Sequence, residues 1–243
     1  MSQSYDGLGG WFEYLNKDCG YEIWSQYLIN RLNGLNAGRQ GVDIGCGNGY
    51  FTRSLIKAGF DVKGVDISVR MLSKAKEISS REGVRAEFLL GDITKLKLTS
   101  KVDFAIAVND CINYVPPEKL SAAFSHVSAC LKKGGSFIFD ISSGYKLKNI
   151  IGDNLFAEDT DDITYLWFNS FKGDRVEMDI TVFEKTSNGA YARTDERHTQ
   201  YIYELSFIKE QLLSSGFSFV ECEGHLGQKL EENSQRINFI CKK

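Results

Sequence analysis

The chain has 243 residues, a formal net charge of −3, 42% hydrophobic residues and 25% charged residues. This composition is ordinary for a globular protein, and the length suits one α/β domain or one such domain with an insert. The negative net charge argues against electrostatic binding to nucleic acid. No apolar stretch approaches the roughly 20 residues that a membrane helix needs.

The N-terminus has no basic segment followed by an apolar one, so we expect no signal peptide. The six cysteines are scattered, with no Cys-x-x-Cys pair and no histidine at metal-ligating spacing. We therefore expect free thiols, no metal and a cytoplasmic protein. We also expect no nucleic-acid or membrane partner, and a monomer or a homodimer.

Strands and helices alternate through the first half of the chain. The predicted elements are helix Tyr21–Leu32, strand Val42–Ile44, helix Tyr50–Ala58, strand Asp61–Val65, helix Val69–Ser80, strand Ala86–Leu90, strand Val102–Val108, helix Pro116–Leu131 and strand Ser136–Ile141. Gly134 and Gly135, after two lysines, are predicted to stop the last of these helices. This alternation predicts a doubly wound, mostly parallel sheet with helices on both faces.

The hydrophobic period changes after residue 141. Val176, Met178, Ile180 and Val182 alternate with polar residues, which predicts a half-buried strand. With the flanking runs Ile163–Phe171 and Tyr191–Tyr203 it predicts a three-stranded antiparallel meander. Helix Ser206–Leu213 and strands Phe217–Cys222 and Arg236–Cys241 then complete a seven-stranded sheet. We expect residues 1–142 and 204–243 to form the main domain, with 143–203 as a β insert.

The run VDIGCGNG, residues 42–49, places a glycine-rich turn between a strand and a helix. Glycine permits positive φ and lets a ligand approach the backbone, and the helix start offers unpaired N–H groups. A dinucleotide or S-adenosylmethionine would suit such a turn. The dinucleotide pattern G-x-G-x-x-G would need a third glycine where Tyr50 stands. Asp66, at the end of the next strand, can accept ribose hydroxyls from either cofactor.

Five motifs in order distinguish the two cofactors. VDIGCGNGYFT, GVDIS with Met71 behind it, FLLGDI, DFAIAVNDCINY and LKKGGSFIFD resemble the class I S-adenosylmethionine-dependent methyltransferases over residues 40–142. The resemblance implies a seven-stranded sheet in which the last strand, Arg236–Cys241, is inserted antiparallel. It also implies S-adenosyl-L-methionine as the cofactor and S-adenosyl-L-homocysteine as its product.

The resemblance assigns roles to residues along these motifs. Gly45, Cys46, Gly47 and Gly49 would hold the methionine part of the cofactor, and Asp66 the ribose. The remaining cofactor residues that it implies are Ile67, Met71, Gly91, Asp92 and Ile93 around the adenine, and Asn109 and Asn113 near the methyl group. The stretch that runs from Asn109 to Tyr114 would border the acceptor.

A narrower resemblance links the chain to small-molecule methyltransferases, including nucleotide-sugar N,N-dimethyltransferases. It rests on a tyrosine-rich N-terminal lid (residues 1–36), on INY after the fourth strand and on the meander ending in ERHTQYIYEL. In the lid, Tyr14, Tyr21 and Trp24 are candidate cofactor contacts, although Trp24 equally suits the apolar side of a packed helix. In the sugar enzymes a histidine takes the place of Tyr114.

The sequence therefore predicts an enzyme that methylates a small polar molecule on nitrogen or oxygen under the roof of the β insert. His198, Tyr114 and Asp110 are candidate bases, but His198 also suits a structural histidine and Asp110 a helix cap. Two alternatives are a non-catalytic module that binds S-adenosylmethionine or its product, and a nicotinamide-dependent reductase. A protein acceptor is a variant of the main hypothesis.

Overall fold

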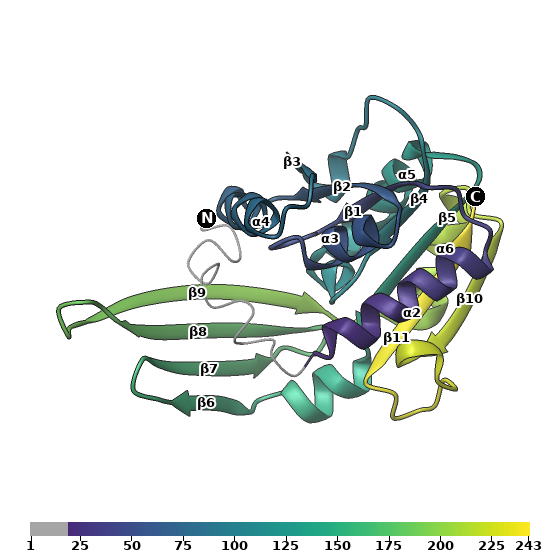
Figure 1. The fold of residues 1–243 in the computed structure, drawn as a ribbon. Helices are drawn as coiled ribbons and strands as arrows, with labels where there is room; N and C mark the ends of the chain where they lie inside the picture. The colour runs from purple at the N-terminus through teal and green to yellow at the C-terminus, as the bar shows by residue number, and fades with distance from the viewer. Residues whose placement is uncertain (1–18) are drawn as a thin grey trace.

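A seven-stranded β-sheet forms the centre of the protein in the computed structural model, which describes residues 19–243 (Figure 1). Its strand order is β10-β11-β5-β4-β1-β2-β3. The strands are β1 (Gln40–Ile44), β2 (Asp61–Asp66), β3 (Glu87–Leu90), β4 (Val102–Ala107), β5 (Leu131–Ser142), β10 (Phe219–Gly224) and β11 (Arg236–Lys242). β1 to β5 are parallel, and β11 runs antiparallel between β5 and β10. The predicted sheet and its inserted last strand are confirmed.

Helices cover both faces of this sheet. They are α2 (Tyr21–Gly34), α3 (Tyr50–Lys57), α4 (Val69–Arg81), α5 (Pro117–Cys130) and α6 (Leu205–Ser214). Phe104 and Ile106 of β4 pack with α2 and α3, whereas Ala105 and Ala107 belong to the opposite core with α5 and α6. Because both of its sides are covered, β4 is almost uniformly apolar, as a buried parallel strand must be.

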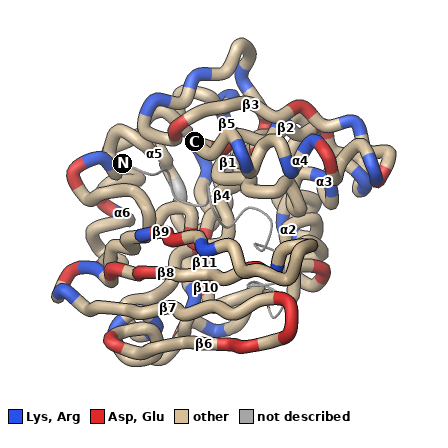
Figure 2. The backbone as a smooth tube through the Cα atoms, turned by 90° about the vertical axis from the view of Figure 1, so that its left-hand side faces the viewer, with Lys and Arg blue, Asp and Glu red and all other residues tan. Residues whose placement is uncertain are grey.

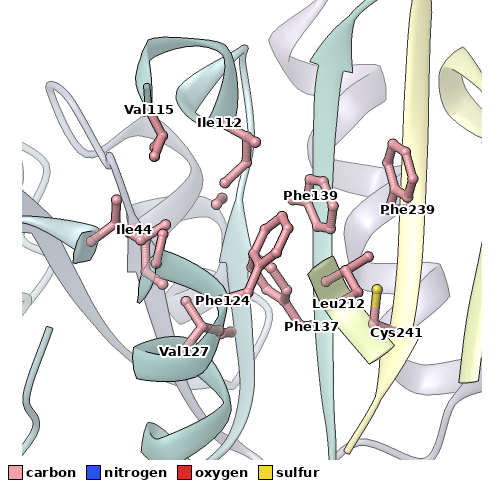
Figure 3. Close-up of a cluster of buried hydrophobic side chains, with 14 of the residues drawn as sticks. Ile44, Ile112, Val115, Phe124, Val127, Phe137, Phe139, Leu212, Phe239 and Cys241 are labelled. Carbon is pink, nitrogen blue, oxygen red and sulfur yellow. The ribbon is translucent and has the colours of Figure 1, made fainter. Parts of the chain in front are cut away.

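Aromatic rings fill the core between β5, β11, α5 and α6 (Figure 3). Phe124 of α5 lies 5.5 Å from Phe139, and Phe139 stacks on Phe239 of β11 with ring centroids 4.6 Å apart. These contacts fix β11 against β5, and the start of β11 thereby comes to lie beside the ends of β4 and β5.

The junction between α5 and β5 differs from the prediction. α5 ends at Cys130 and β5 begins at the next residue, so Gly134 and Gly135 lie inside the strand. Gly134 has a φ of 75°, and its N–H donates to the carbonyl of Lys243 at 3.1 Å. The β4–β5 register shifts here, between Val102 and Phe104. The glycine pair therefore shapes an irregular strand start instead of a helix cap.

The β insert is a four-stranded antiparallel sheet, one strand larger than predicted. Its strands are β6 (Leu155–Asp159), β7 (Ile163–Phe171), β8 (Arg175–Lys185) and β9 (Tyr191–Tyr201), preceded by a π-helical turn η3 (Lys146–Ile151). β6 is a short, acidic edge strand. It lacks the apolar alternation that marks β8, which is why the sequence pattern did not predict it. The opposite edge strand, β9, lies on the side that faces α3 and α4 (Figure 1).

Charges of both signs are interspersed along the backbone (Figure 2). The acidic residues Glu158, Asp159, Asp161 and Asp162 form the red segment around the β6–β7 turn. All six cysteines are free thiols, as predicted. Within residues 19–243, no helix combines the length and the apolar character that crossing a membrane would require.

Candidate active site

A cavity of about 430 Å³ opens at the carboxyl ends of β1, β2 and β4. This is where open parallel sheets place their ligands, because the turns that follow the strands converge there. The wall combines the glycine turn after β1, the end of β2, the loop after β4 and one side of β9. The residues from β9 are Arg197, Thr199 and Tyr201.

The glycine turn has the backbone that its sequence predicts. Gly45, Gly47 and Gly49 have φ values of 69°, 54° and 78°, a region that side chains with a Cβ rarely adopt. A Cβ on Gly45 would also lie 2.5 Å from the Sγ of Cys111, which packs on the turn from the loop after β4. The turn is therefore tied to glycine both by its conformation and by its contact with that loop.

Asp66 lies beside the glycine turn. Its carboxylate accepts the N–H of Gly47 and the N–H of Ser68, each at 2.8 Å. These two bonds fix the carboxylate at the cavity wall, where a ribose would meet it. The structure thus brings together the two features that the sequence places 21 positions apart.

A second, smaller cavity of about 280 Å³ adjoins the first, with Gly45, Asp66 and Tyr114 lining both. Gly91, Asp92 and Ile93 line the smaller one. Asp92 begins the 3₁₀ turn η1 (Ile93–Lys95), and its Oδ1 accepts the N–H and the hydroxyl of Thr94, both at 2.8 Å. Ile67 lines both cavities and Met71 only the larger. The residues predicted for the adenine therefore line two adjoining cavities.

Cys46, which is predicted to hold the methionine part of the cofactor, lines the larger cavity but is largely buried. Burial, with the nearby carboxylates of Asp43 and Asp66, raises the pKa of this thiol well above its ordinary value. Burial and carboxylates likewise raise the pKa of Cys111. Both sulfurs are therefore protonated at neutral pH, which suits small packing groups and does not suit nucleophiles.

The loop after β4 divides into residues that line the cavity and residues that support it. Asn109 and Tyr114 line the larger cavity. Asp110 does not: its carboxylate accepts from Arg236 at 2.6 Å and from the Ser142 hydroxyl at 2.8 Å. Burial alone would raise the pKa of Asp110, but the charges of Arg236 and Lys146 hold it below its usual value. This geometry favours an anchoring role for Asp110 over proton transfer.

Asn113 is fully buried in the short turn η2 (Cys111–Tyr114) and also stays outside the cavity wall. Its side chain exchanges hydrogen bonds with the backbone of Ser142 and donates to the carbonyl of Tyr201 at 2.9 Å. Asn113 therefore holds the loop in place from behind the cavity wall.

His198 is 1% exposed and does not line the cavity. Its Nε2 lies 2.7 Å from Oε2 of Glu196, which is also buried, and its ring meets Tyr114 edge to face at 5.9 Å. The imidazole thus contacts the cavity wall through Tyr114 and is not part of it. An effect of His198 on methyl transfer would have to pass through Tyr114.

The N-terminal residues divide in the same way. Tyr21 lines the cavity and lies 4.8 Å from Tyr50, which also lines it. Trp24 is 1% exposed, packs on Phe51 and on the guanidinium of Arg236, and does not line the cavity. Tyr14 and the first half of the predicted lid lie outside the described residues.

Sequence reasoning missed several charged residues beside the site. Asp43 of β1 is 1% exposed directly before the glycine turn, and Thr52 donates to it at 2.6 Å. Burial raises the pKa of Asp43 to about 7. Asp140, Arg236 and Glu196 are likewise buried. An acidic residue within an apolar strand, as in VDI and FDI, was the available signal. Within residues 19–243, no group of three or more histidine, cysteine or acidic side chains could hold a metal.

The residues around the two cavities fit S-adenosylmethionine. A positive-φ glycine turn admits the amino-acid end, Asp66 offers a fixed carboxylate for the ribose, and Ile67 and Met71 offer apolar surface. Buried or nearby carboxylates favour a cofactor that carries a sulfonium charge.

Comparisons with known proteins agree with this geometry. Residues 42–135 match a protein family described as a methyltransferase domain. The chain is 32% identical over 248 residues to a protein of Geobacillus sp. (strain WCH70) described as a methyltransferase, covering 99% of this chain and 100% of that protein. It superimposes on an S-adenosylmethionine-dependent methyltransferase from Clostridium acetobutylicum with a TM-score of 0.89 and 30% identity, covering 99% of both chains.

A sugar N-methyltransferase from Streptoalloteichus shares the fold, with a TM-score of 0.81 at 16% identity over 100% of this chain and 96% of that one. The full-length matches to the Geobacillus protein and to the Clostridium methyltransferase structure exclude the nicotinamide reductase alternative. The chain belongs to the S-adenosylmethionine-dependent methyltransferases.

Proposed function

We propose that this enzyme methylates the nitrogen or oxygen of a small polar molecule with an apolar body. The observation that supports this most is the wall of the larger cavity outside the candidate cofactor residues. That part of the wall includes four aromatic rings, from Tyr50, Phe51, Tyr114 and Tyr201. Arg197 and Thr199 add polar groups from β9. Rings that enclose an apolar body, with a few polar groups to orient it, are typical of small-molecule sites.

Size and charge support a small acceptor. A cavity of about 430 Å³ lies within the range of small-molecule pockets and must also admit part of the cofactor. The net charge of −3 and the mixed charges of Figure 2 do not favour a nucleic-acid acceptor. The six free thiols support a cytoplasmic location.

Methyl transfer requires mainly that the protein align the acceptor with the methyl group of the cofactor. The cofactor supplies a methyl group on a sulfonium, which is already a good leaving group. The chain's part is to hold the acceptor in line and to exclude water, and the aromatic wall does both. A base is needed only if the acceptor must lose a proton in the transition state. Of the three predicted bases, Tyr114 is the one that lines the cavity.

The relatives are compatible with either acceptor atom. The Streptoalloteichus protein that shares the fold is a sugar N-methyltransferase, and proteins that match about half of this chain are ubiquinone biosynthesis O-methyltransferases. We therefore keep both nitrogen and oxygen in the proposal.

Incubation with methyl-labelled S-adenosylmethionine and a fractionated metabolite extract tests this proposal. We expect label in one small-molecule fraction, and much less when Asp66→Ala enzyme is used at a subsaturating concentration of S-adenosylmethionine. Label that stays with protein or nucleic acid would overturn the small-molecule acceptor. A separate thermal-shift measurement should show stabilisation by S-adenosylhomocysteine and none by NAD or NADP. If the protein binds S-adenosylhomocysteine but never transfers label in any extract, the non-catalytic alternative would stand.

A further inference from the structure

The loop that borders the cavity after β4 begins with two residues in a disfavoured conformation. Asn109 and Asp110 have φ values of 62° and 66°, and they are two of the four non-glycine residues with positive φ among residues 19–243. Asparagine and aspartate tolerate this region better than other side chains, but two in succession require external support. The support is visible in the contacts of the loop.

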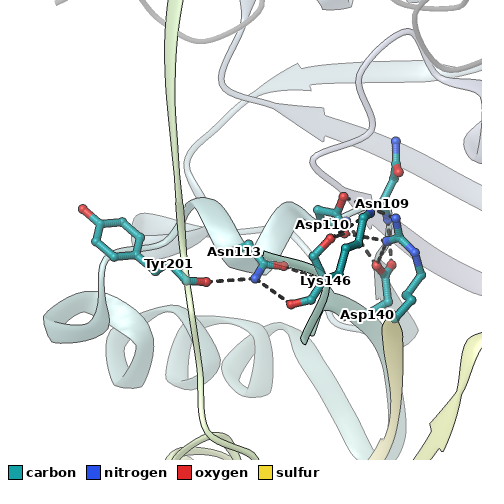
Figure 4. A network of polar contacts seen from close by, with 8 residues as sticks. Asn109, Asp110, Asn113, Asp140, Lys146 and Tyr201 are labelled. Atoms are coloured by element: carbon teal, nitrogen blue, oxygen red, sulfur yellow. Dashed lines mark hydrogen bonds and ion pairs between the residues drawn. The ribbon is translucent and has the colours of Figure 1, made fainter. Parts of the chain in front are cut away.

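Asp140, near the end of β5, holds the backbone of both residues. Its Oδ1 accepts the N–H of Asn109 at 2.7 Å, and its Oδ2 accepts the N–H of Asp110 at 3.2 Å (Figure 4). A carboxylate is suited to this task because it offers two acceptor atoms and no donor. Asp140 is fully buried, so solvent cannot replace either bond.

Arg236, the first residue of β11, connects this carboxylate to the loop. Its guanidinium bonds to Asp140 and, at 2.6 Å, to Asp110. The guanidinium also lies 4.7 Å from the ring of Trp24 on α2. Ser142 and Lys146 extend the network, because the Ser142 hydroxyl donates to Asp110 and accepts from Lys146 at 3.1 Å. Arg236 thus connects β5, β11 and helix α2 to the start of the loop.

The other end of the loop is held by Asn113, which lies between the main sheet and β9 (Figure 4). The loop presents Asn109, at the first attachment, and Tyr114, directly after the second, to the cavity. The wall on this side is therefore set by groups that never touch the cavity.

We propose that Asp140 and Arg236 are positioning residues for methyl transfer, which act by holding the Asn109–Tyr114 loop in its left-handed start. The inference rests on the proposed function for its catalytic consequence, but the hold on the loop can be measured separately. A shift of about 1 Å in a positioning element can cost on the order of a hundredfold in rate. We expect the affinity for S-adenosylhomocysteine, which lacks the methyl group near Asn109, to depend mainly on the glycine turn and Asp66.

Asp140→Asn is the principal test, because the amide keeps the size of the side chain but replaces one acceptor by a donor. Asp103→Asn is a matched control: Asp103 also accepts a backbone N–H, from Gln40 at 3.0 Å, and a lysine, Lys132 at 2.7 Å, but at the amino end of β4. In Asp140→Asn we expect hydrogen exchange of the Asn109 and Asp110 amides to accelerate at least tenfold. In Asp103→Asn these amides should exchange as in the wild type.

The functional arm uses the metabolite fraction that the wild type labels. With saturating S-adenosylmethionine, Asp140→Asn should transfer label roughly 10- to 100-fold more slowly, while its dissociation constant for S-adenosylhomocysteine stays within about twofold of the wild type. If Asp140→Asn does not fold, Arg236→Lys and Arg236→Met replace it. The lysine variant keeps the charge and should recover part of the transfer rate that the methionine variant loses.

Unchanged amide exchange in Asp140→Asn would overturn the inference even if the protein proves to be a small-molecule methyltransferase. So would a loss of cofactor affinity that matches the loss of transfer, because that pattern indicates general destabilisation. A wild type that labels no small molecule would instead refute the proposed function, and amide exchange would still decide whether Asp140 holds the loop.

Discussion

The hydroxyl of Thr52 donates to the buried carboxylate of Asp43 at 2.6 Å, directly beneath the glycine turn. Burial raises the pKa of Asp43 from 3.8 to about 7, with Thr52 opposing this and Asp66 adding to it. Between roughly pH 4 and pH 7 the folded protein therefore holds a proton that the unfolded chain has lost. The free energy of unfolding should fall as pH rises through this window, and this contribution should stay constant above it.

The first prediction follows from this linkage. The Asp43→Asn variant has no group that titrates at this position. The difference between its free energy of unfolding and that of the wild type should therefore change in its favour by a few kcal/mol, up to roughly 4, as the pH rises from 4 to 8. Urea denaturation of both proteins at several pH values provides the measurement. Parallel stability curves for the two proteins would show that Asp43 titrates normally.

The second prediction concerns cofactor charge. S-adenosylmethionine carries a sulfonium charge that S-adenosylhomocysteine lacks, and an ionised Asp43 should favour the charged ligand. The ratio of the two affinities should therefore shift toward S-adenosylmethionine by roughly three- to fivefold between pH 6 and pH 8. Calorimetric titration with both ligands measures it. Asp43→Asn should abolish the shift, and a shift that persists in this variant would assign it to another group.

The third prediction concerns Asp66. A carboxylate that accepts two ribose hydroxyls contributes about 2 kcal/mol, so Asp66→Ala should weaken S-adenosylmethionine binding roughly thirtyfold. Asp61→Ala is the control, because Asp61 is exposed at the opposite end of the same strand. Equal dissociation constants for Asp66→Ala and the wild type would remove Asp66 from the cofactor site.

The fourth prediction separates backbone strain from ligand contact. Gly47 and Gly83 both have positive φ, 54° and 67°, but only Gly47 lines the cavity. Gly47→Val and Gly83→Val should each lose about 1–2 kcal/mol of stability, whereas only Gly47→Val should lose the thermal shift with S-adenosylhomocysteine. If Gly83→Val also fails to bind, general destabilisation explains both results.

Local motifs predicted more of the site than of its support. Gly45, Gly47 and Asp66 were predictable because each closes a strand or forms the turn after it, and parallel strands bring their ends together. The number of strands in the insert was not predictable, because β6 pairs as a short edge without apolar alternation. The partnership of Arg236 with Asp140 joins residues 96 positions apart, so no local pattern records it.

Side-chain direction was the second limit. Trp24 and Tyr21 lie on the same helix, yet only Tyr21 reaches the cavity, because Trp24 is directed to Phe51 and Arg236. On β9, Arg197 and Tyr201 line the cavity while His198, one residue from Arg197, does not. Alternation along a strand predicts that neighbours differ, but which set faces the ligand depends on how the insert docks on the main domain.

The fifth prediction separates the roles of Tyr114 and His198. Tyr114→Phe removes only the hydroxyl from the cavity wall, so turnover should fall by roughly 10²–10⁴-fold if the phenol handles a proton, with cofactor affinity near that of the wild type. His198→Ala removes the partner of buried Glu196 and the ring that packs on Tyr114. We expect it to lower the free energy of unfolding by roughly 3 kcal/mol, because it removes a buried hydrogen-bond partner of Glu196 and leaves a cavity beside Tyr114.

Glu196→Gln with His198→Ala completes this comparison. The double variant also removes the buried charge that His198 contacts, so it should regain part of the lost stability. If its turnover returns as well, His198 serves folding alone. If stability returns while turnover stays low, His198 acts on the reaction by orienting Tyr114, because the imidazole itself lies outside the cavity. Denaturation curves and label transfer distinguish these outcomes when both are measured on the wild type, Tyr114→Phe, His198→Ala and the double variant.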